Sequence, residues 1–118
     1  MAKTAGKRQR QRQQRPRMTP LTPATRRRLN LLFAPSDRVE AAKLLVSECG
    51  NNLPMMEDAS ASALDRFRLA ALKLSGGTLR GLRSAIALAK TDWRDLLIAA
   101  GFGHDVNAHR KWQAKVRR

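Results

Sequence analysis

The charges of this chain are segregated along its length, and this separation limits which part of it can fold. Of its 118 residues, 24 are Lys or Arg and 9 are Asp or Glu, giving a formal net charge of +15. Residues 1–35 hold ten of the cations and no acid, and residues 110–118 hold five more cations. The other nine cations and all nine acids fall in residues 36–109, which are therefore formally neutral. The pattern is typical of a folded unit with basic ends that bind nucleic acid or an acidic surface.

Residues 1–24 are predicted to form a disordered, Arg/Gln-rich basic arm. The segment contains the run KRQRQRQQRPR, three prolines and almost no apolar residues, so it cannot bury enough surface to fold alone. The first 32 residues contain no Phe, Tyr or Trp that would stack on bases, which favours sequence-tolerant contacts to phosphates. A solubilising tail is the alternative interpretation. Organellar import is a minor alternative, because a transit peptide is Arg-rich and acid-poor like this run but also has an apolar stripe that the run lacks.

Residues 25–109 are predicted to form an all-α domain, a compact bundle of four or five short helices. Glycine and proline punctuate the segment, and no sustained period-two alternation indicates strands. Capping residues and apolar spacing predict helices over about 26–33, 37–49, 62–74, 78–89 and 91–100. A basic amphipathic stretch near 106–116 predicts a C-terminal helix or tail, with the charge in residues 110–118. The expected core residues are Leu29, Leu32 and Phe33; Val39, Ala42, Leu45, Val46 and Cys49; Leu64, Phe67, Ala71 and Leu74; Leu82, Ala85, Ile86 and Ala89; Trp93, Leu96, Leu97 and Ala100; and Val106, His109, Trp112 and Val116.

The composition also bears on location. No apolar run approaches the roughly 18 residues of a membrane span, so no membrane partner is expected. The single cysteine excludes an internal disulfide and fits a reducing compartment. We therefore expect a cytoplasmic protein.

The start of the first predicted helix carries an unusual charge order. Arg26, Arg27 and Arg28 follow the expected cap Thr25, whereas the macrodipole favours acids at this end. Each cation there costs up to about 1 kcal/mol at low salt, so a bound anion would relieve the repulsion and ligate free N–H groups. This predicts a phosphate clamp. The alternative is a helix that begins later or frays.

The turn Ser75-Gly76-Gly77 between two predicted helices has about the length of a helix-turn-helix turn. In that interpretation Arg80, Arg83, Thr78 and Ser84 would lie on the exposed start of a recognition helix. Leu69 and Lys73 stand where this motif commonly has a small residue and a glycine, which favours an ordinary helical hairpin. The same turn could instead hold an anion on its backbone N–H groups.

Metal and catalytic chemistry have little support in the sequence. One cysteine and two histidines five residues apart match no zinc spacing, so no metal or cofactor is expected. Cys49 ends an apolar stripe and is interpreted as a buried small hydrophobe. His104 and Asp105 are adjacent, but adjacent side chains seldom face each other and no nucleophile is specified. We expect neither an enzyme nor a small-molecule substrate.

The leading hypothesis is a protein that binds RNA or DNA through phosphate contacts, within a larger assembly. Arginine outnumbers lysine by 17 to 7, and planar guanidinium groups bind phosphate oxygens bidentately. The predicted nucleic-acid-binding residues are Arg8, Arg10, Arg12, Arg15, Arg17, Arg26, Arg27, Arg28, Arg80, Arg83, Arg110, Lys111, Lys115, Arg117 and Arg118.

The alternative is an adaptor domain that binds another protein, with tails that serve solubility or an acidic partner. Two methionines in a loop fill core gaps or form a soft patch for a partner helix. The candidate partner surface is Met55, Met56, Trp93, Phe102 and Trp112.

Overall fold

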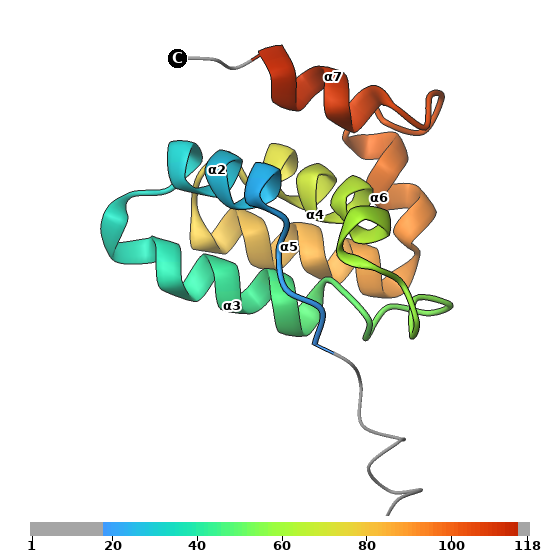
Figure 1. The fold of residues 1–118 in the computed structure, drawn as a ribbon, viewed down its shortest axis with the longest axis horizontal. Helices are drawn as coiled ribbons and strands as arrows, with labels where there is room; N and C mark the ends of the chain where they lie inside the picture. The colour runs from blue at the N-terminus through green and yellow to red at the C-terminus, as the bar shows by residue number, and fades with distance from the viewer. Residues whose placement is uncertain (1–17, 116–118) are drawn as a thin grey trace, which may run out of the picture.

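A computed structural model describes residues 18–115, and this part of the chain is all-α, as the sequence predicts (Figure 1). It contains six α-helices, where the sequence predicts a bundle of four or five, because the basic C-terminal segment also folds as a helix. The α-helices are α2 (Pro23–Leu32), α3 (Arg38–Glu48), α4 (Ala61–Ser75), α5 (Leu79–Thr91), α6 (Trp93–Ala99) and α7 (Ala108–Lys115), and a 3-10 turn, η1 (Pro35–Asp37), precedes α3.

Capping side chains set where these helices begin, and several predicted caps are wrong by one to three residues. The side chains of Thr22 and Ser60 accept hydrogen bonds from the backbone of the third residue along, so α2 and α4 begin earlier than predicted. Asp92 caps α6 in place of the predicted Thr91, because Thr91 is the last residue of α5. Thr78 caps α5 as predicted.

Helix α4 lies at the centre of the fold and packs against α2, α5, α6 and α7. The sequence predicts this helix as the hydrophobic centre, and its side chains are buried from Phe67 to Leu72 without a break. Helix α5 supplies the second layer of the core. Its four predicted core residues, Leu82, Ala85, Ile86 and Ala89, are all buried.

Two predicted core positions in the described part of the chain are wrong, and a third, Val116, lies outside it. Val39 is 79% exposed, because the buried face of α3 runs through Ala41, Leu45 and Cys49. Val106 is 65% exposed because α7 begins only at Ala108. Helix α3 follows its N-cap Asp37, close to the predicted start, so for Val39 the error lies in which face of the helix packs inward. For Val106 the error lies in the start of the helix.

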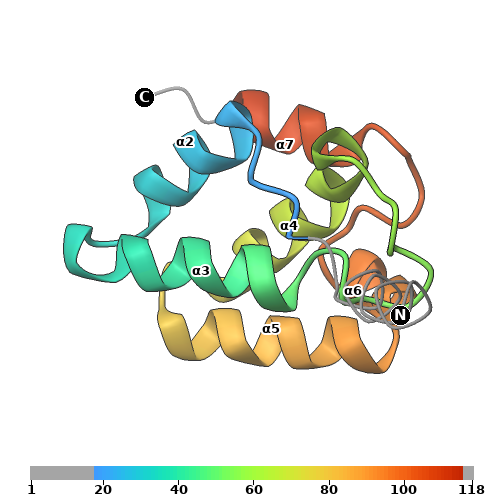
Figure 2. The same ribbon diagram turned by 60° about the horizontal axis from the view of Figure 1, so that its bottom comes forward.

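The helices are arranged around α4 so that the two ends of the described chain leave at different places. Helices α3 and α5 run side by side in both views, and α7 lies on the other side of α4 (Figures 1 and 2). The described chain starts at the lower side of Figure 1 and ends in α7 at the upper side. No helix of the described residues is long and apolar enough to cross a bilayer.

The turn between α4 and α5 approaches the end of α2 closely. Gly77 has φ +84, and a Cβ there would lie 2.6 Å from the carbonyl oxygen of Leu32. Only glycine fits both this backbone conformation and this contact. The turn therefore holds the α4–α5 pair against α2.

Candidate nucleic-acid interface

The start of α2 is neutralised from within the protein. The hydroxyls of Thr22 and Thr25 both donate to Oδ1 of Asp65 on α4, at 2.8 and 2.7 Å. A carboxylate thus lies beside the positive end of the helix, where the macrodipole favours it. Arg26 is only the fourth residue of α2, because the helix begins at Pro23. The premise of the predicted phosphate clamp is therefore wrong, and Asp65 takes the place of the external anion.

Arg28 points into the protein rather than toward a ligand. Its side chain is 2% exposed, and its guanidinium lies over the Trp112 ring, 3.6 Å from the ring centroid. Its Nη2 donates to the carbonyl oxygen of Trp112 at 2.8 Å. Burial lowers the pKa of Arg28 from its usual value. Arg28 therefore joins α2 to α7, and its predicted contact with phosphate is wrong.

The contact between Arg28 and Trp112 joins two helices that each carry exposed cations. Arg26 and Arg27 on α2, and Arg110 and Lys111 on α7, are all exposed. Figure 2 shows α2 and α7 as neighbours along one edge of the molecule. We call these four side chains the α2–α7 cations.

Most of the α2–α7 cations lack an internal counter-ion. Lys111 Nζ lies 2.7 Å from Asp105 Oδ2, and its hydrogen bond lowers the pKa of Asp105, as does the backbone N–H of Asn107. Among residues 18–115, no ion pair involves Arg26, Arg27 or Arg110. An exposed pair such as Lys111–Asp105 contributes little to stability, so a phosphate can replace the carboxylate at little cost.

One of the two phosphate-contacting arginines predicted on α5 already forms an ion pair with α3. Arg80 and Arg83 are exposed, but Arg83 Nη2 lies 3.4 Å from Oε2 of Glu40. Helix α5 would be the recognition helix of the predicted helix-turn-helix. It packs against α3, α4 and α6, so other helices lie directly beside it.

Two N–H groups of the predicted anion cradle at the α4–α5 turn already have internal acceptors, which leaves fewer donors for an anion. The N–H of Gly77 donates to Ser75 Oγ, and the N–H of Gly81 donates to Thr78 Oγ1, both at 3.0 Å.

The remaining predicted contacts cannot be placed. The side chains of the following residues lie outside the described part of the chain: Arg8, Arg10, Arg12, Arg15, Arg17, Lys115, Arg117 and Arg118.

The residues of the predicted partner surface do not form one surface. Phe102 is 1% exposed and belongs to the core, and Trp112 packs between Arg28 and Phe102. Met56 is half-buried against the core, whereas Met55 is 81% exposed. Met55 and Trp93 line one hollow, and Phe102 and Trp112 line a different one beneath α7.

Sequence reasoning missed Arg68, which organises the N-terminal side of the fold. Its side chain is fully buried and donates to the carbonyl oxygens of Cys49, Pro20 and Thr19 at 3.1, 2.9 and 2.7 Å. Residues 18–24, assigned to the arm by sequence, therefore contact the helical body. Helical periodicity could have indicated its burial, since residue 68 lies one helical turn after the core residue Leu64.

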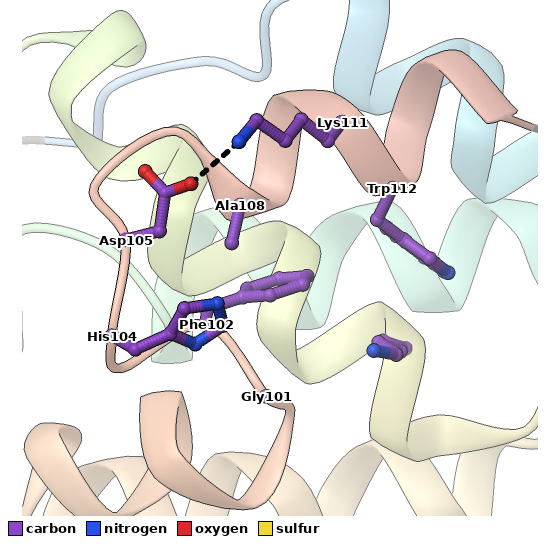
Figure 3. A pocket seen from close by; sticks show the side chains of 8 residues that line it. Gly101, Phe102, His104, Asp105, Ala108, Lys111 and Trp112 are labelled. Carbon is purple, nitrogen blue, oxygen red and sulfur yellow. Dashed lines mark hydrogen bonds and ion pairs between the residues drawn. The ribbon is translucent and has the colours of Figure 1, made fainter.

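A pocket of about 190 Å³ beneath α7 contains the sequence's one suggested acid–base pair (Figure 3). Asp105 is paired with Lys111 and not with His104, which is exposed. Lys73 Nζ donates to the carbonyl oxygen of Ala100 at 2.8 Å, so this cation serves the end of α6. The ionic groups drawn in Figure 3 thus stabilise the loop before α7 and the end of α6.

Two further titratable side chains of the described region, Cys49 and His109, are buried. Cys49 is fully buried, as predicted, and burial raises the pKa of its thiol to about 12. His109 is 5% exposed, and its pKa is lowered by burial and then by the nearby charge of Arg110. Within residues 18–115, no three His, Cys, Asp or Glu side chains gather to hold a metal ion.

Comparison of the chain with protein-family models, with curated proteins and with solved structures found no match.

Proposed function

We propose that the protein binds RNA or DNA through phosphate contacts made by its arginine-rich ends and by the α2–α7 cations. The observation that carries this proposal is the unneutralised excess of cations. In the described region the paired acids Glu40, Glu48, Asp92 and Asp105 bind cations of residues 83–111 and leave Arg26, Arg27 and Arg110 without a carboxylate. A polyanion would supply the missing counter-charge.

The joint between α2 and α7 supports a preorganised contact. Because Arg28 is fixed on Trp112, the two helices hold their exposed cations in a constant relation before any ligand arrives. Side chains that are already positioned lose less entropy on binding. Phosphate contact of this kind positions a protein without reading bases, so we expect weak dependence on sequence.

The test is salt-dependent binding of full-length protein to a 20-base-pair duplex, measured by fluorescence anisotropy. The observed association constant should fall on a log–log plot with a slope of about −0.9 per phosphate neutralised. Replacing Arg26 and Arg27 by Gln should weaken binding and flatten the slope by up to about 1.8, if each contacts one phosphate. The matched control replaces two exposed cations of α3 and α5, Lys43 and Lys90, and should leave the slope nearly unchanged.

The arm is tested by replacing its five arginines with Gln in the full-length chain. Substitution is preferable to deleting residues 1–24, because Thr19 and Pro20 accept hydrogen bonds from Arg68. Equal slopes for the arm variant, the α2 variant and the control would contradict the proposal.

A further inference from the structure

An apolar groove runs along α6, on residues that the proposed function does not use. Three hollows of about 370, 240 and 350 Å³ follow one another there. The first two share Trp93 and Arg94, and the last two share Ile98 and Gly103, so they form one continuous surface. We call this surface the α6 groove.

The α6 groove exposes large apolar side chains. Met55 at one end is 81% exposed and Ile98 farther along is 67% exposed, with the half-buried ring of Trp93 between them in the chain of hollows. Contiguous exposed apolar surface with a polar border is typical of interaction sites. Methionine adapts to partners of different shape.

Arg66 gives the α6 groove a specific electrostatic requirement. Its guanidinium is held by a hydrogen bond from Nη2 to the carbonyl oxygen of Phe102 at 2.9 Å, and its side chain lines the central hollow. Its Nε is a buried atom without a hydrogen-bond partner, so an incoming carboxylate would have to pair with the rest of the guanidinium. No ion pair involves Arg66 within the described residues. A half-buried guanidinium beside apolar side chains is best matched by a carboxylate, through charge-assisted hydrogen bonds.

Two other occupants fit the α6 groove poorly. The chain segments outside the structure, residues 1–17 and 116–118, contain only Met1, Ala2, Ala5 and Val116 as apolar side chains, too few to fill it. Nucleic acid is disfavoured because the carboxylate of Asp92 lines the groove and Arg94 lies over the Trp93 ring, 5.9 Å from its centroid. That ring face is not open for stacking on a base.

We propose that the α6 groove binds an amphipathic α-helix of another protein. Aliphatic side chains one turn apart on that helix would contact Met55, Trp93 and Ile98, and an Asp or Glu would pair with Arg66. This is the helix-in-groove mode of recognition, in which apolar anchors give affinity and the charged pair fixes orientation. The inference is independent of nucleic-acid binding, which uses α2, α7 and the chain ends.

The chain contains two isoleucines, which makes a methyl NMR test specific. Ile98 lies in the α6 groove and Ile86 is 4% exposed in α5, so the δ1-methyl of Ile86 is an internal control. The probe is a synthetic 18-residue amphipathic peptide with leucines one turn apart and flanking glutamates, and its twin carries glutamines instead. In 150 mM NaCl the acidic peptide should shift the Ile98 methyl signal and leave that of Ile86 in place.

The affinity of each labelled peptide, measured by fluorescence anisotropy, then tests the proposed pair between Arg66 and an acidic residue of the peptide. The acidic peptide should bind full-length protein at least about fivefold more tightly than its twin, and Arg66→Gln should remove most of this difference. Replacing Arg26 and Arg27 by Gln is the matched control for general attraction to a cationic protein, and it should preserve the difference. Met55→Asn should weaken both peptides, since asparagine tolerates the φ of +70 at this position without supplying apolar surface.

Three results would overturn the inference. The first is an Ile98 methyl that neither peptide shifts. The second is a 12-nucleotide single strand that shifts Ile98, which would assign the groove to nucleic acid. The third is an Ile98 signal that changes with protein concentration alone, which would assign the groove to a second copy of the chain.

Discussion

Two arginines are among the largest fully buried side chains of this protein, and their guanidinium groups connect separate segments. Arg68 ties residues 19, 20 and 49 to α4, and Arg28 ties α2 to the backbone of α7. Each guanidinium donates to carbonyl oxygens outside its own helix. Residue type alone predicts both arginines to be exposed, whereas helical periodicity predicts both positions to be buried.

Arg68 should therefore be among the residues most important for stability. Arg68→Met would leave the carbonyl oxygens of Cys49, Pro20 and Thr19 without this donor, so we expect the free energy of unfolding to fall by about 3 kcal/mol. Urea unfolding followed by circular dichroism measures it. Arg80→Met, at an exposed position on α5, should change stability by less than about 0.5 kcal/mol. Equal effects of the two substitutions would contradict this role.

Cys49 should react slowly while the protein is folded. Burial raises the pKa of its thiol to about 12, so almost none is thiolate at pH 8. We expect modification by a chromogenic disulfide to be at least about 100-fold slower in buffer than in 6 M guanidinium, where the pKa returns to about 8.5. The chain has no other cysteine, so the absorbance reports this thiol alone. A similar rate in both solvents would show that the thiol is accessible.

At the scale of the helix, periodicity predicted most elements, whereas contacts distant in sequence determined the rest. The apolar spacing of α4 and α5 is regular, and these helices were predicted closely. The start of α2 was not, because its stabilising carboxylate, Asp65, lies 40 residues beyond Thr25. The joint between Arg28 and Trp112 spans 84 residues. Local sequence contains no information on such pairs, so the candidate interface was predicted only as a set of charges.

Helix α7 should make stability depend on pH through His109. Burial and the nearby charges of Arg110 and Arg66 lower the pKa of His109, and Asp65 acts in the opposite direction. As the pH falls, the imidazole is therefore protonated in the unfolded chain before it is protonated in the folded protein. The neutral buried imidazole is compatible with the fold above about pH 6.5, and stability is lost below it. The urea midpoint should fall between pH 7.5 and 5.5, and less so in His109→Gln.

Exposed His104 offers the matched control for this pH dependence, since His104→Gln should retain the full loss of the parent protein. Asp92 and Asp105 have pKa values lowered below 3.8 by their hydrogen bonds, so they titrate outside this window. An unchanged pH dependence in His109→Gln would exclude His109 as the source.

Over the whole molecule, charge and apolar exposure are divided between different elements. The exposed cations without carboxylate partners on α2 and α7 lie near the C-terminal end of the described chain, whereas the α6 groove is built from α6, α4 and the loop before α4. Arg94 is paired with Asp92, so Arg66 is the lining arginine of the groove without a carboxylate in the described part of the chain, and a partner with few acids matches it better than a polyphosphate. Under the two proposals, a nucleic acid and a protein would bind at separate places on the molecule.

The uneven charge should also make the folded state more stable as salt rises. At a net charge of +15, repulsion among cations acts against the compact state, and the four exposed ion pairs within residues 18–115 offset little of it. Raising NaCl from 10 to 100 mM shortens the screening length from about 30 to about 10 Å, so repulsion should weaken more than attraction within pairs. We expect the urea midpoint to rise over this range. The variant with five arm arginines replaced by Gln should start higher at 10 mM and rise less. A midpoint that falls with salt would show that attractive pairs dominate, and the cations would then already be balanced within the protein.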